Sequence, residues 1–255
     1  MDAIILAAGS GRRLGTGRPK CLTMIGGRRL IDHQLDALAA AGVRRPVVVV
    51  GYKREQVIAA LAGRARVVVN KRYAHTNSMY SFLLAREHVR GATFVLNADV
   101  LFDPLVAQRL ARRPGSALAC DSTSGDEDEH MKVEMADGRL RSMSKTLGTR
   151  LCAGENLGLL CLDETAAREA FEAAATLVAL GGERAWLAAA INAIARRESI
   201  ECVDVAGTPW VEIDFPADLA HARRTVWPAI ARRSQPRRAA RDWRIALAAH
   251  EGVAA

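Results

Sequence analysis

A stretch rich in glycine and arginine, directly after the first apolar run, has the residue types that bind phosphate. It reads Leu6-Ala7-Ala8-Gly9-Ser10-Gly11-Arg12-Arg13-Leu14-Gly15, and Lys20 follows it closely. Glycines at the end of a strand let backbone N–H groups turn toward an anion, and the basic side chains add positive charge. We therefore predict that this loop binds phosphate groups.

Two common phosphate-loop patterns fit this stretch poorly. A dinucleotide fingerprint requires a third glycine where Leu14 stands and an acidic residue at the end of the second strand, where the chain has Val50-Gly51-Tyr52. A P-loop requires Gly-Lys followed by Ser or Thr, whereas the chain has Pro19-Lys20-Cys21. A plain tight turn at Gly9 and Gly11 is the structural alternative, and the basic residues around them disfavour it.

Carboxylates follow two other apolar stretches. Asp99 comes directly after the run Phe94-Val95-Leu96-Asn97-Ala98, and Glu212-Ile213-Asp214 precedes Pro216. Ligands of open α/β sheets bind at the carboxyl ends of the strands, where Asp99 is expected. Two carboxylates, with waters and substrate oxygens, are an ordinary ligand set for Mg²⁺. The alternative for Asp214 is to cap the helix that begins at Pro216.

Short apolar runs alternate with amphipathic stretches through the first 120 residues. Strands are expected at residues 3–8, 46–50, 65–69, 93–96 and 116–120, and helices at residues 30–41, 54–61, 78–89 and 104–112. The strands are apolar throughout, as in sheets that are covered on both faces. We predict an α/β fold with a Rossmann-like, mostly parallel sheet flanked by helices and joined by right-handed crossovers.

The pattern changes after Asp121. Residues 132–135 alternate like a half-exposed strand, Asp137-Gly138 is a hairpin turn, and strands at 140–145 and about 157–162 complete a small antiparallel layer over about 122–162. Helices are expected at residues 164–175, 183–197 and 216–233, and strands at 200–205 and 210–214. We expect one domain over residues 1–233, followed by a basic helical tail over residues 234–255.

Composition excludes several classes of protein. Between residues 222 and 245 there are eight arginines and one aspartate, so that this segment carries +7 of the net charge of +8. Few aromatic residues accompany it, and we expect a solvated helix and no nucleic-acid interface.

The five cysteines form no Cys-x-x-Cys pair, which argues against a disulfide framework or a zinc knuckle. Neither a signal peptide nor an apolar run of about 20 residues is found, so we expect a cytoplasmic protein without a membrane span.

The spacing Leu-Ala-Ala-Gly-x-Gly-x-Arg-Leu, followed by Arg18-Pro19-Lys20-Cys21-Leu22, resembles the signature of the MobA-like and sugar-nucleotide nucleotidyltransferases. The resemblance extends from residue 3 to about residue 223. It implies that Asp99 and Asp214 bind Mg²⁺ and that the catalytic residues are Arg12, Lys20 and Lys132. The nucleotide-binding residues that it implies are Leu6, Ala7, Ala8, Gly9, Ser10, Gly11, Arg12, Arg13, Lys20, Gly51, Tyr52, Asn77, Ser78 and Asn97.

Within this family, three segments are similar to the phosphocholine- and phosphonate-type cytidylyltransferases. They are Asn77-Ser78-Met79-Tyr80-Ser81, Met131-Lys132-Val133-Glu134 and Gly154-Glu155-Asn156-Leu157-Gly158. The similarity implies that Lys132, Lys145 and Glu155 bind the acceptor, and Asp128 and Glu129 belong to an acidic loop that is expected beside this acceptor site. Asp128 and Glu129 would recognise a cationic head of the acceptor, and the alternative is that their loop is merely solvated.

The predicted function is therefore that of a Mg²⁺-dependent cytidylyltransferase, which transfers CMP from CTP to a small phosphate or phosphonate acceptor and releases pyrophosphate. No strong base is required, because such an acceptor is already largely ionised near neutral pH, the second pKa of a phosphate monoester being about 6. A sugar-1-phosphate nucleotidyltransferase is the alternative enzyme, and a non-catalytic nucleotide-binding protein is the alternative of another class. A homodimer is left open.

Overall fold

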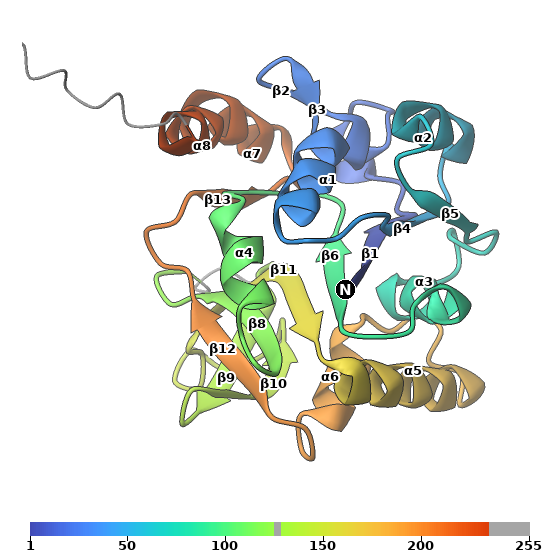
Figure 1. The fold of residues 1–255 in the computed structure, drawn as a ribbon, viewed down its shortest axis with the longest axis vertical. Coiled ribbons are helices and arrows are strands. Elements are labelled where there is room, and N and C mark those ends of the chain that lie inside the picture. Colours follow the sequence, from blue (N-terminus) through green and yellow to red (C-terminus); the bar gives the residue numbers. More distant parts are fainter. Residues whose placement is uncertain (125–128, 235–255) are drawn as a thin grey trace, which may run out of the picture.

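The computed structural model describes residues 1–124 and 129–234. In this part of the chain, nine strands form one sheet in the order β5-β4-β1-β6-β11-β8-β12-β10-β9 (Figure 1). Their bounds are β1 Asp2–Ala7, β4 Val47–Val50, β5 Arg66–Val69, β6 Thr93–Asn97, β8 Ser116–Asp121, β9 Lys132–Ala136, β10 Arg139–Ser144, β11 Gly154–Leu162 and β12 Ile200–Asp204. Asp128 and the predicted tail from residue 235 onward lie outside the described residues.

The predicted α/β class is confirmed, and the sheet combines parallel and antiparallel pairs. Strands β5, β4, β1 and β6 are parallel to one another, as are β8 and β12. Strand β11 runs antiparallel to both β6 and β8, between which it lies. The sequence placed this strand in an appended layer, but it is longer than predicted and lies at the centre of the sheet.

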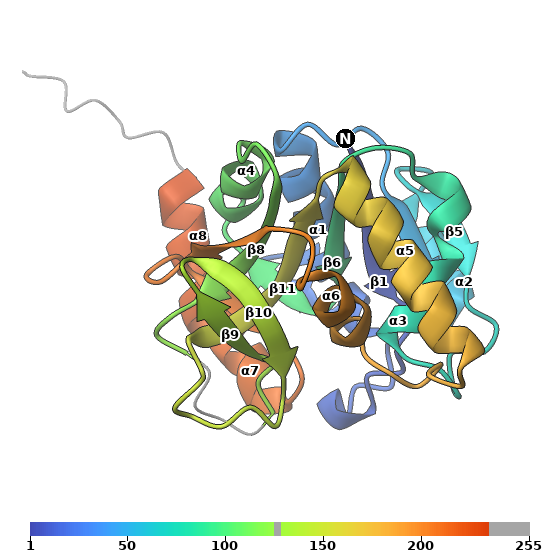
Figure 2. The same cartoon turned by 90° about the horizontal axis from the view of Figure 1, so that it is seen from below.

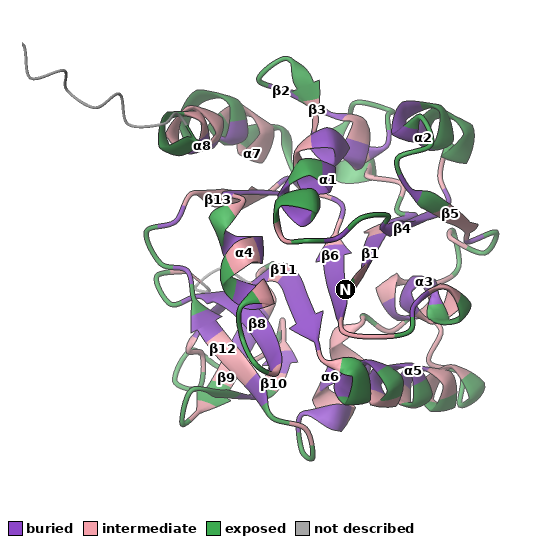
Figure 3. Ribbon diagram, viewed as in Figure 1, coloured by how far each residue is buried: buried purple, intermediate pink, exposed green. Residues whose placement is uncertain are grey.

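Helices cover both faces of the sheet (Figure 2). One apolar cluster joins it to α1 (Leu30–Ala40), α2 (Arg54–Leu61) and α4 (Leu105–Ala111), and a second joins it to α3 (Ser78–Leu84), α5 (Glu164–Ala179) and α6 (Ala188–Ile194). Ile5 of β1 belongs to the first cluster and Ile4 to the second, since neighbouring side chains of a strand point to opposite faces. Strands β1, β4, β6, β8 and β11 are accordingly buried along most of their length, whereas β5, β9, β10 and β12 are more exposed (Figure 3).

Short elements shape the edge of the sheet where the site lies. Strands β7 (Val100–Phe102) and β13 (Trp210–Glu212) pair with each other, and β2 (Met24–Ile25) pairs with β3 (Arg28–Arg29). The C-terminal segment contains α7 (Pro216–His221), a π-helical stretch (Ala222–Val226) and α8 (Trp227–Ser234). It packs over β2 through a third apolar cluster, in which Ile25 and Ile230 are buried.

The predicted hairpin is present. Strands β9 and β10 pair around Asp137 and Gly138, which have φ angles of 52° and 72°. Two successive residues with positive φ are typical of the tight turns that suit the twist of a hairpin. The hairpin joins the main sheet through β12 and β11.

Two helices are shorter than the sequence predicts. Helix α3 ends at Leu84 and is followed by a 3₁₀ turn at Arg86–His88, and α6 begins only at Ala188. The segment before α6 binds the start of α3 instead, because the Asn77 N–H donates to the Glu183 carbonyl and the Leu187 N–H donates to Ser78 Oγ. Tertiary hydrogen bonds have replaced the first turn of the predicted helix.

Gly154 begins β11 at a point where two backbones meet. Its φ is 151°, and a Cβ atom there would lie 2.4 Å from the Asp121 carbonyl oxygen of β8. No side chain fits in this space without moving one of the two strands. The glycine is therefore required by the packing of the sheet.

We predict that Gly154→Ala lowers the free energy of unfolding by about 1–3 kcal/mol, because it forces strands β11 and β8 apart. Urea denaturation measures this difference. Gly148→Ala is the matched control, since nothing lies within 4 Å of a Cβ atom at that position. Equal stability of the two variants would contradict the steric argument.

Candidate functional site

A cavity of about 390 Å³ opens at the carboxyl ends of β1 and β6. This volume lies in the range that binds small molecules. Most of the predicted site residues line it, namely Leu6, Ala7, Gly9, Ser10, Gly11, Arg12, Arg13, Lys20, Asn77, Ser78, Asn97, Asp99, Glu129, Lys145 and Asp214. Ala8 lines a smaller cavity of about 150 Å³, which shares Gly9, Asn77 and Asn97 with the first. The structure thus gathers residues from distant parts of the sequence in one place.

The predicted phosphate loop bends back onto Lys20. Gly11 has a φ of 58°, and a Cβ atom there would lie 2.7 Å from Lys20 Cγ. From outside, the Tyr52 N–H donates to the Ala8 carbonyl at 3.0 Å, and the Tyr52 hydroxyl donates to the Gly17 carbonyl at 3.3 Å. Gly51 and Tyr52 line neither cavity, so the structure places them as supports of the loop.

Three carboxylates meet beside this loop. Asp99 lies in the turn between β6 and β7, Glu212 ends β13, and Asp214 follows it. One oxygen from each lies within 4.8 Å of the others. Pairing of β13 with β7, in which Glu212 is opposite Val100, brings them together. Glu212, which is not one of the two predicted metal ligands Asp99 and Asp214, is therefore a full member of the cluster.

Asp214 does not cap the helix that follows it. The N-cap residue is Phe215, and Asp218 Oδ2 of the first helical turn accepts hydrogen bonds from the Asp214 and Phe215 backbone N–H groups at 2.9 and 2.7 Å. The capping alternative for Asp214 is therefore wrong. Its carboxylate is left to face the cavity.

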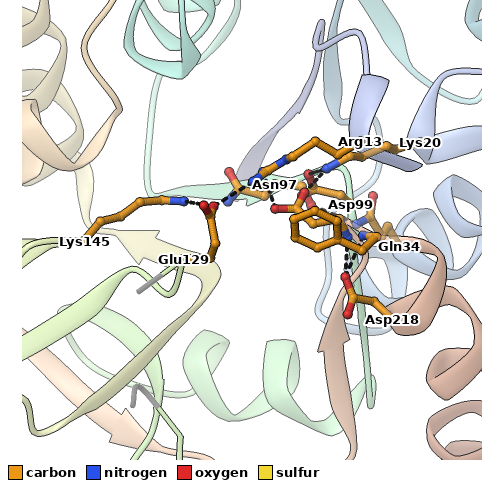
Figure 4. Close-up of polar contacts among 10 residues, drawn as sticks. Arg13, Lys20, Gln34, Asn97, Asp99, Glu129, Lys145 and Asp218 are labelled. Carbon is orange, nitrogen blue, oxygen red and sulfur yellow. Dashed lines mark hydrogen bonds and ion pairs between the residues drawn. The ribbon is translucent and has the colours of Figure 1, made fainter. Parts of the chain in front are cut away.

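Basic side chains neutralise the carboxylate cluster (Figure 4). Lys20 Nζ donates to Asp99 at 3.1 Å and also to Asp214, and Arg13 binds both Asp214 and, at 2.6 Å, Glu129. Lys145 Nζ completes a chain of ion pairs across the cavity by contacting Glu129 at 3.2 Å. A metal ion would therefore compete with these cations for the carboxylates. Phosphate groups would compete with the carboxylates for Lys20, Arg13 and Lys145.

Burial and charge shift the titration of this cluster. Burial by itself would lower the pKa of the Lys20 ammonium, but Asp99 and Asp214 outweigh it and the pKa is raised. Burial, with the negative charges of Asp99 and Asp214, raises the pKa of Glu212 to about 8. Burial also raises the pKa of Cys21, at the cavity wall, to about 12. Cys21 is thus a thiol and a poor nucleophile.

Two predicted acceptor residues lie away from the cavities. Lys132 and Glu155 are opposite each other in the pairing of β9 with β11, and their residues are only 4% and 3% exposed. Ser124 Oγ donates to Glu155, and His130 Nδ1 lies 3.2 Å from it. A binding role for Lys132 and Glu155 stays a prediction, and the structure gives neither a place on the cavity wall.

Sequence reasoning missed an apolar wall. Val95, Leu160 and Leu118 stand side by side on β6, β11 and β8 and line the cavity. Further apolar residues that line the cavity are Met131, Met143, Trp186, Leu187, Ala188 and Ile191. Helix α6 is held against β10 because Asn192 Oδ1 accepts from the Met143 N–H and Asn192 Nδ2 donates to the Met143 carbonyl. From sequence, these residues could not be told from ordinary core.

A basic glycine loop beside a carboxylate cluster, at the edge of such a sheet, is the arrangement of a nucleotidyltransferase. The chain belongs to the MobA-like NTP transferase domain family, whose model matches residues 3–252. No helix in the described residues is long and apolar enough to cross a membrane.

Two curated relatives of the chain have names that give different products. The chain is 43% identical over 126 residues to the CMP-5′-(3-aminopropyl)phosphonate synthase of Streptomyces rubellomurinus, which covers 46% of this chain and 20% of the relative. It is 32% identical over 235 residues to the bifunctional IPC transferase and DIPP synthase of Rubrobacter xylanophilus. That match covers 86% of this chain and 50% of the relative. The chain thus spans half or less of these relatives.

A solved structure shows the same fold. The CTP:phosphocholine cytidylyltransferase of Streptococcus pneumoniae matches with a TM-score of 0.72 at 23% identity, over 87% of this chain and 97% of that one.

The shifted pKa of Glu212 predicts a pH effect on stability. An unfolded glutamate ionises near 4.5 and the folded Glu212 near 8, so between these values the folded state binds more protons and loses stability as the pH rises. The Glu212→Gln variant has no carboxyl group to ionise at this position, so it does not lose this stability as the pH rises. In metal-free buffer, its Tm relative to the wild type should rise from about pH 5 to about pH 8.

Calorimetry at both pH values measures the shift. Glu87→Gln, at an exposed position in the 3₁₀ turn before β6, is the control. A constant difference in Tm between Glu212→Gln and the wild type would contradict the assignment.

Proposed function

We propose that the chain is a cytidylyltransferase that transfers CMP from CTP to a small phosphate or phosphonate acceptor and releases pyrophosphate. The carboxylate cluster in contact with Lys20 of the phosphate loop carries this proposal. The relatives support CTP as the nucleotide, because the Streptomyces relative is named for a CMP conjugate of a phosphonate and the Streptococcus structure for a CTP-dependent enzyme.

Asp99 and Asp214 are the proposed ligands of Mg²⁺, with Glu212 as a third carboxylate. The donor set fits, because Mg²⁺ prefers carboxylate oxygens and keeps several waters. Its chemistry, when bound, is to neutralise charge on the phosphate oxygens. Glu212 must give up its proton before it can contribute a full negative charge to this set.

The residues of the phosphate loop stabilise the leaving group. An acceptor oxyanion attacks the α-phosphorus, a new P–O bond forms, and the bond from the α-phosphorus to the bridging oxygen breaks. The electron pair leaves with pyrophosphate, whose charge is compensated by Arg12, Lys20 and the backbone N–H groups of Gly9 and Gly11. Lys20 and Arg13 can exchange their carboxylate partners for phosphate oxygens, since both groups are anionic acceptors.

We assign the cytosine ring to the smaller cavity. Its lining includes the polar side chains of Asn70, Tyr73, Thr76 and Ser81 beside Asn77 and Ser78. Asn70 is held in place, because its Nδ2 donates to Thr76 Oγ1 and Ser81 Oγ at 3.0 Å each. A base offers hydrogen-bonding edges that such groups can pair with.

The acceptor is then assigned to the apolar wall of the larger cavity. Lys145, which also lines this cavity and is paired with Glu129, can exchange that carboxylate for the acceptor's anionic oxygens. Val95, Leu118 and Leu160 suit methylene groups. They cannot pair with the hydroxyl groups of a sugar, and burying unpaired hydroxyls is costly. This wall favours an alkyl or aminoalkyl acceptor over the sugar-1-phosphate alternative.

Replacing Asp99 by Asn should leave the fold intact and lower kcat by at least about a hundredfold, because it removes charge stabilisation from the transition state. Pyrophosphate release from CTP and 3-aminopropylphosphonate measures this. Asp36→Asn is the matched control, since Asp36 forms exposed ion pairs with Arg28 and Arg64.

Near-normal turnover by the Asp99→Asn variant would remove Asp99 from the reaction. If the wild-type chain bound CTP but released no pyrophosphate with any phosphate or phosphonate acid, the non-catalytic alternative would hold.

A homologous series tests the apolar wall. Each methylene added from methyl- to ethyl- to propylphosphonate should raise kcat/KM about fourfold, since burying one CH₂ is worth about 0.8 kcal/mol. Glucose 1-phosphate should be a poor acceptor. A flat series, or a preference for the sugar phosphate, would place the acceptor elsewhere.

A further inference from the structure

A buried glutamine of α1 holds the turn that carries Asp99. Gln34 Nε2 donates to the Asn97 carbonyl at 2.9 Å and to the Val100 carbonyl at 2.8 Å, and the residue is 1% exposed. These two carbonyls flank Ala98 and Asp99. Figure 4 shows Gln34 behind the site, close to Asn97 and Asp99. One side-chain amide therefore bridges the end of β6 and the start of β7.

This amide is an unusual choice for its position. Ile31, Leu35 and Leu38, which lie on the same helix one turn or less away, are apolar and buried. Gln34 Oε1 is buried without a hydrogen-bond partner among the described residues. A buried acceptor without a partner is destabilising, and a methionine of similar length would avoid it. The two donors of Nε2 must therefore supply something that packing alone does not.

What they supply is the position of one backbone turn. The Asp99 carbonyl accepts from the Ile213 N–H at 2.9 Å on the side of β13. On the side of α1, Gln34 anchors the residues before and after the turn. With both anchors in place, the Asp99 carboxylate is held within 4.8 Å of the oxygens of Glu212 and Asp214.

We propose that Gln34 is a positioning residue, which fixes Asp99 relative to Asp214 and Glu212 so that the three can bind one divalent cation. This inference rests on the proposed function, because it takes the carboxylate cluster as the metal site. Gln34 lines neither cavity. Its effect passes through the backbone at Asn97 and Val100.

The test measures binding of Mn²⁺ alone to the nucleotide-free protein by isothermal titration calorimetry. Gln34→Met keeps the length of the side chain and removes both donors. We expect its dissociation constant for Mn²⁺ to rise at least about fivefold, because misplaced ligands weaken a metal site. Gln34→Glu is the second variant. Protonated, as burial favours, it keeps one donor and should bind with intermediate affinity.

Leu38→Ala is the control for a purely structural role. Leu38 lies on the same helix and is fully buried, so that its truncation lowers Tm without touching the turn. Unchanged Mn²⁺ affinity in both Gln34 variants, or an equal loss in Leu38→Ala, would overturn the proposal. Should Gln34→Met fail to fold, the comparison of Gln34→Glu with Leu38→Ala decides.

Asp99→Asn in the same titration separates this inference from the proposed function. If Asp99→Asn binds Mn²⁺ like the wild type, the metal site itself is wrong. If Asp99→Asn loses binding and the Gln34 variants keep it, only the role of Gln34 is wrong.

Discussion

Three carboxylates with oxygens within 4.8 Å of one another repel strongly in a half-buried site, and the rest of the molecule is arranged around that repulsion. Lys20 and Arg13 bring positive charge from the loop after β1, and Glu212 retains a proton to higher pH than usual. The ion pair of Lys20 with Asp214 joins residues 194 positions apart. Electrostatic balance thus ties the two ends of the described chain to one another.

The parallel part of the sheet could be predicted because its strands carry their own signal. Four consecutive valines at 47–50 and the apolar start of the chain can be buried only as central strands, and the intervening helices are amphipathic. Strand β11 could not be placed in this way. Its position between β6 and β8 depends on pairing with residues far along the chain, and Gly154 reports a close approach to Asp121 that is visible only in three dimensions.

The site divides in the same manner. Lys20 and the glycines of the loop are recognisable because their spacing is local, and Asp99 because it ends a strand. The place of Glu212 in the cluster depends on the pairing of β13 with β7, and no local sequence pattern predicts this pairing. Lys132 and Lys145 are the same residue type near the same hairpin, and only their positions in the fold decide which of them reaches the cavity. Lys132 lies inside β9 and is buried against β11, whereas Lys145 follows the end of β10 and reaches the cavity.

Part of the apolar wall lies on elements that carry neither the phosphate loop nor the carboxylates, although Val95 shares β6 with the turn of Asp99. Met143 of β10 and Ile191 of α6 are bound to each other's elements through Asn192, while the loop and the carboxylates belong to β1, β6 and β13. Substitutions in this part of the wall can therefore change its shape without moving the loop or the carboxylates. Under the proposed function, changes in one hairpin and one short helix would alter the choice of acceptor while the nucleotide chemistry stays the same.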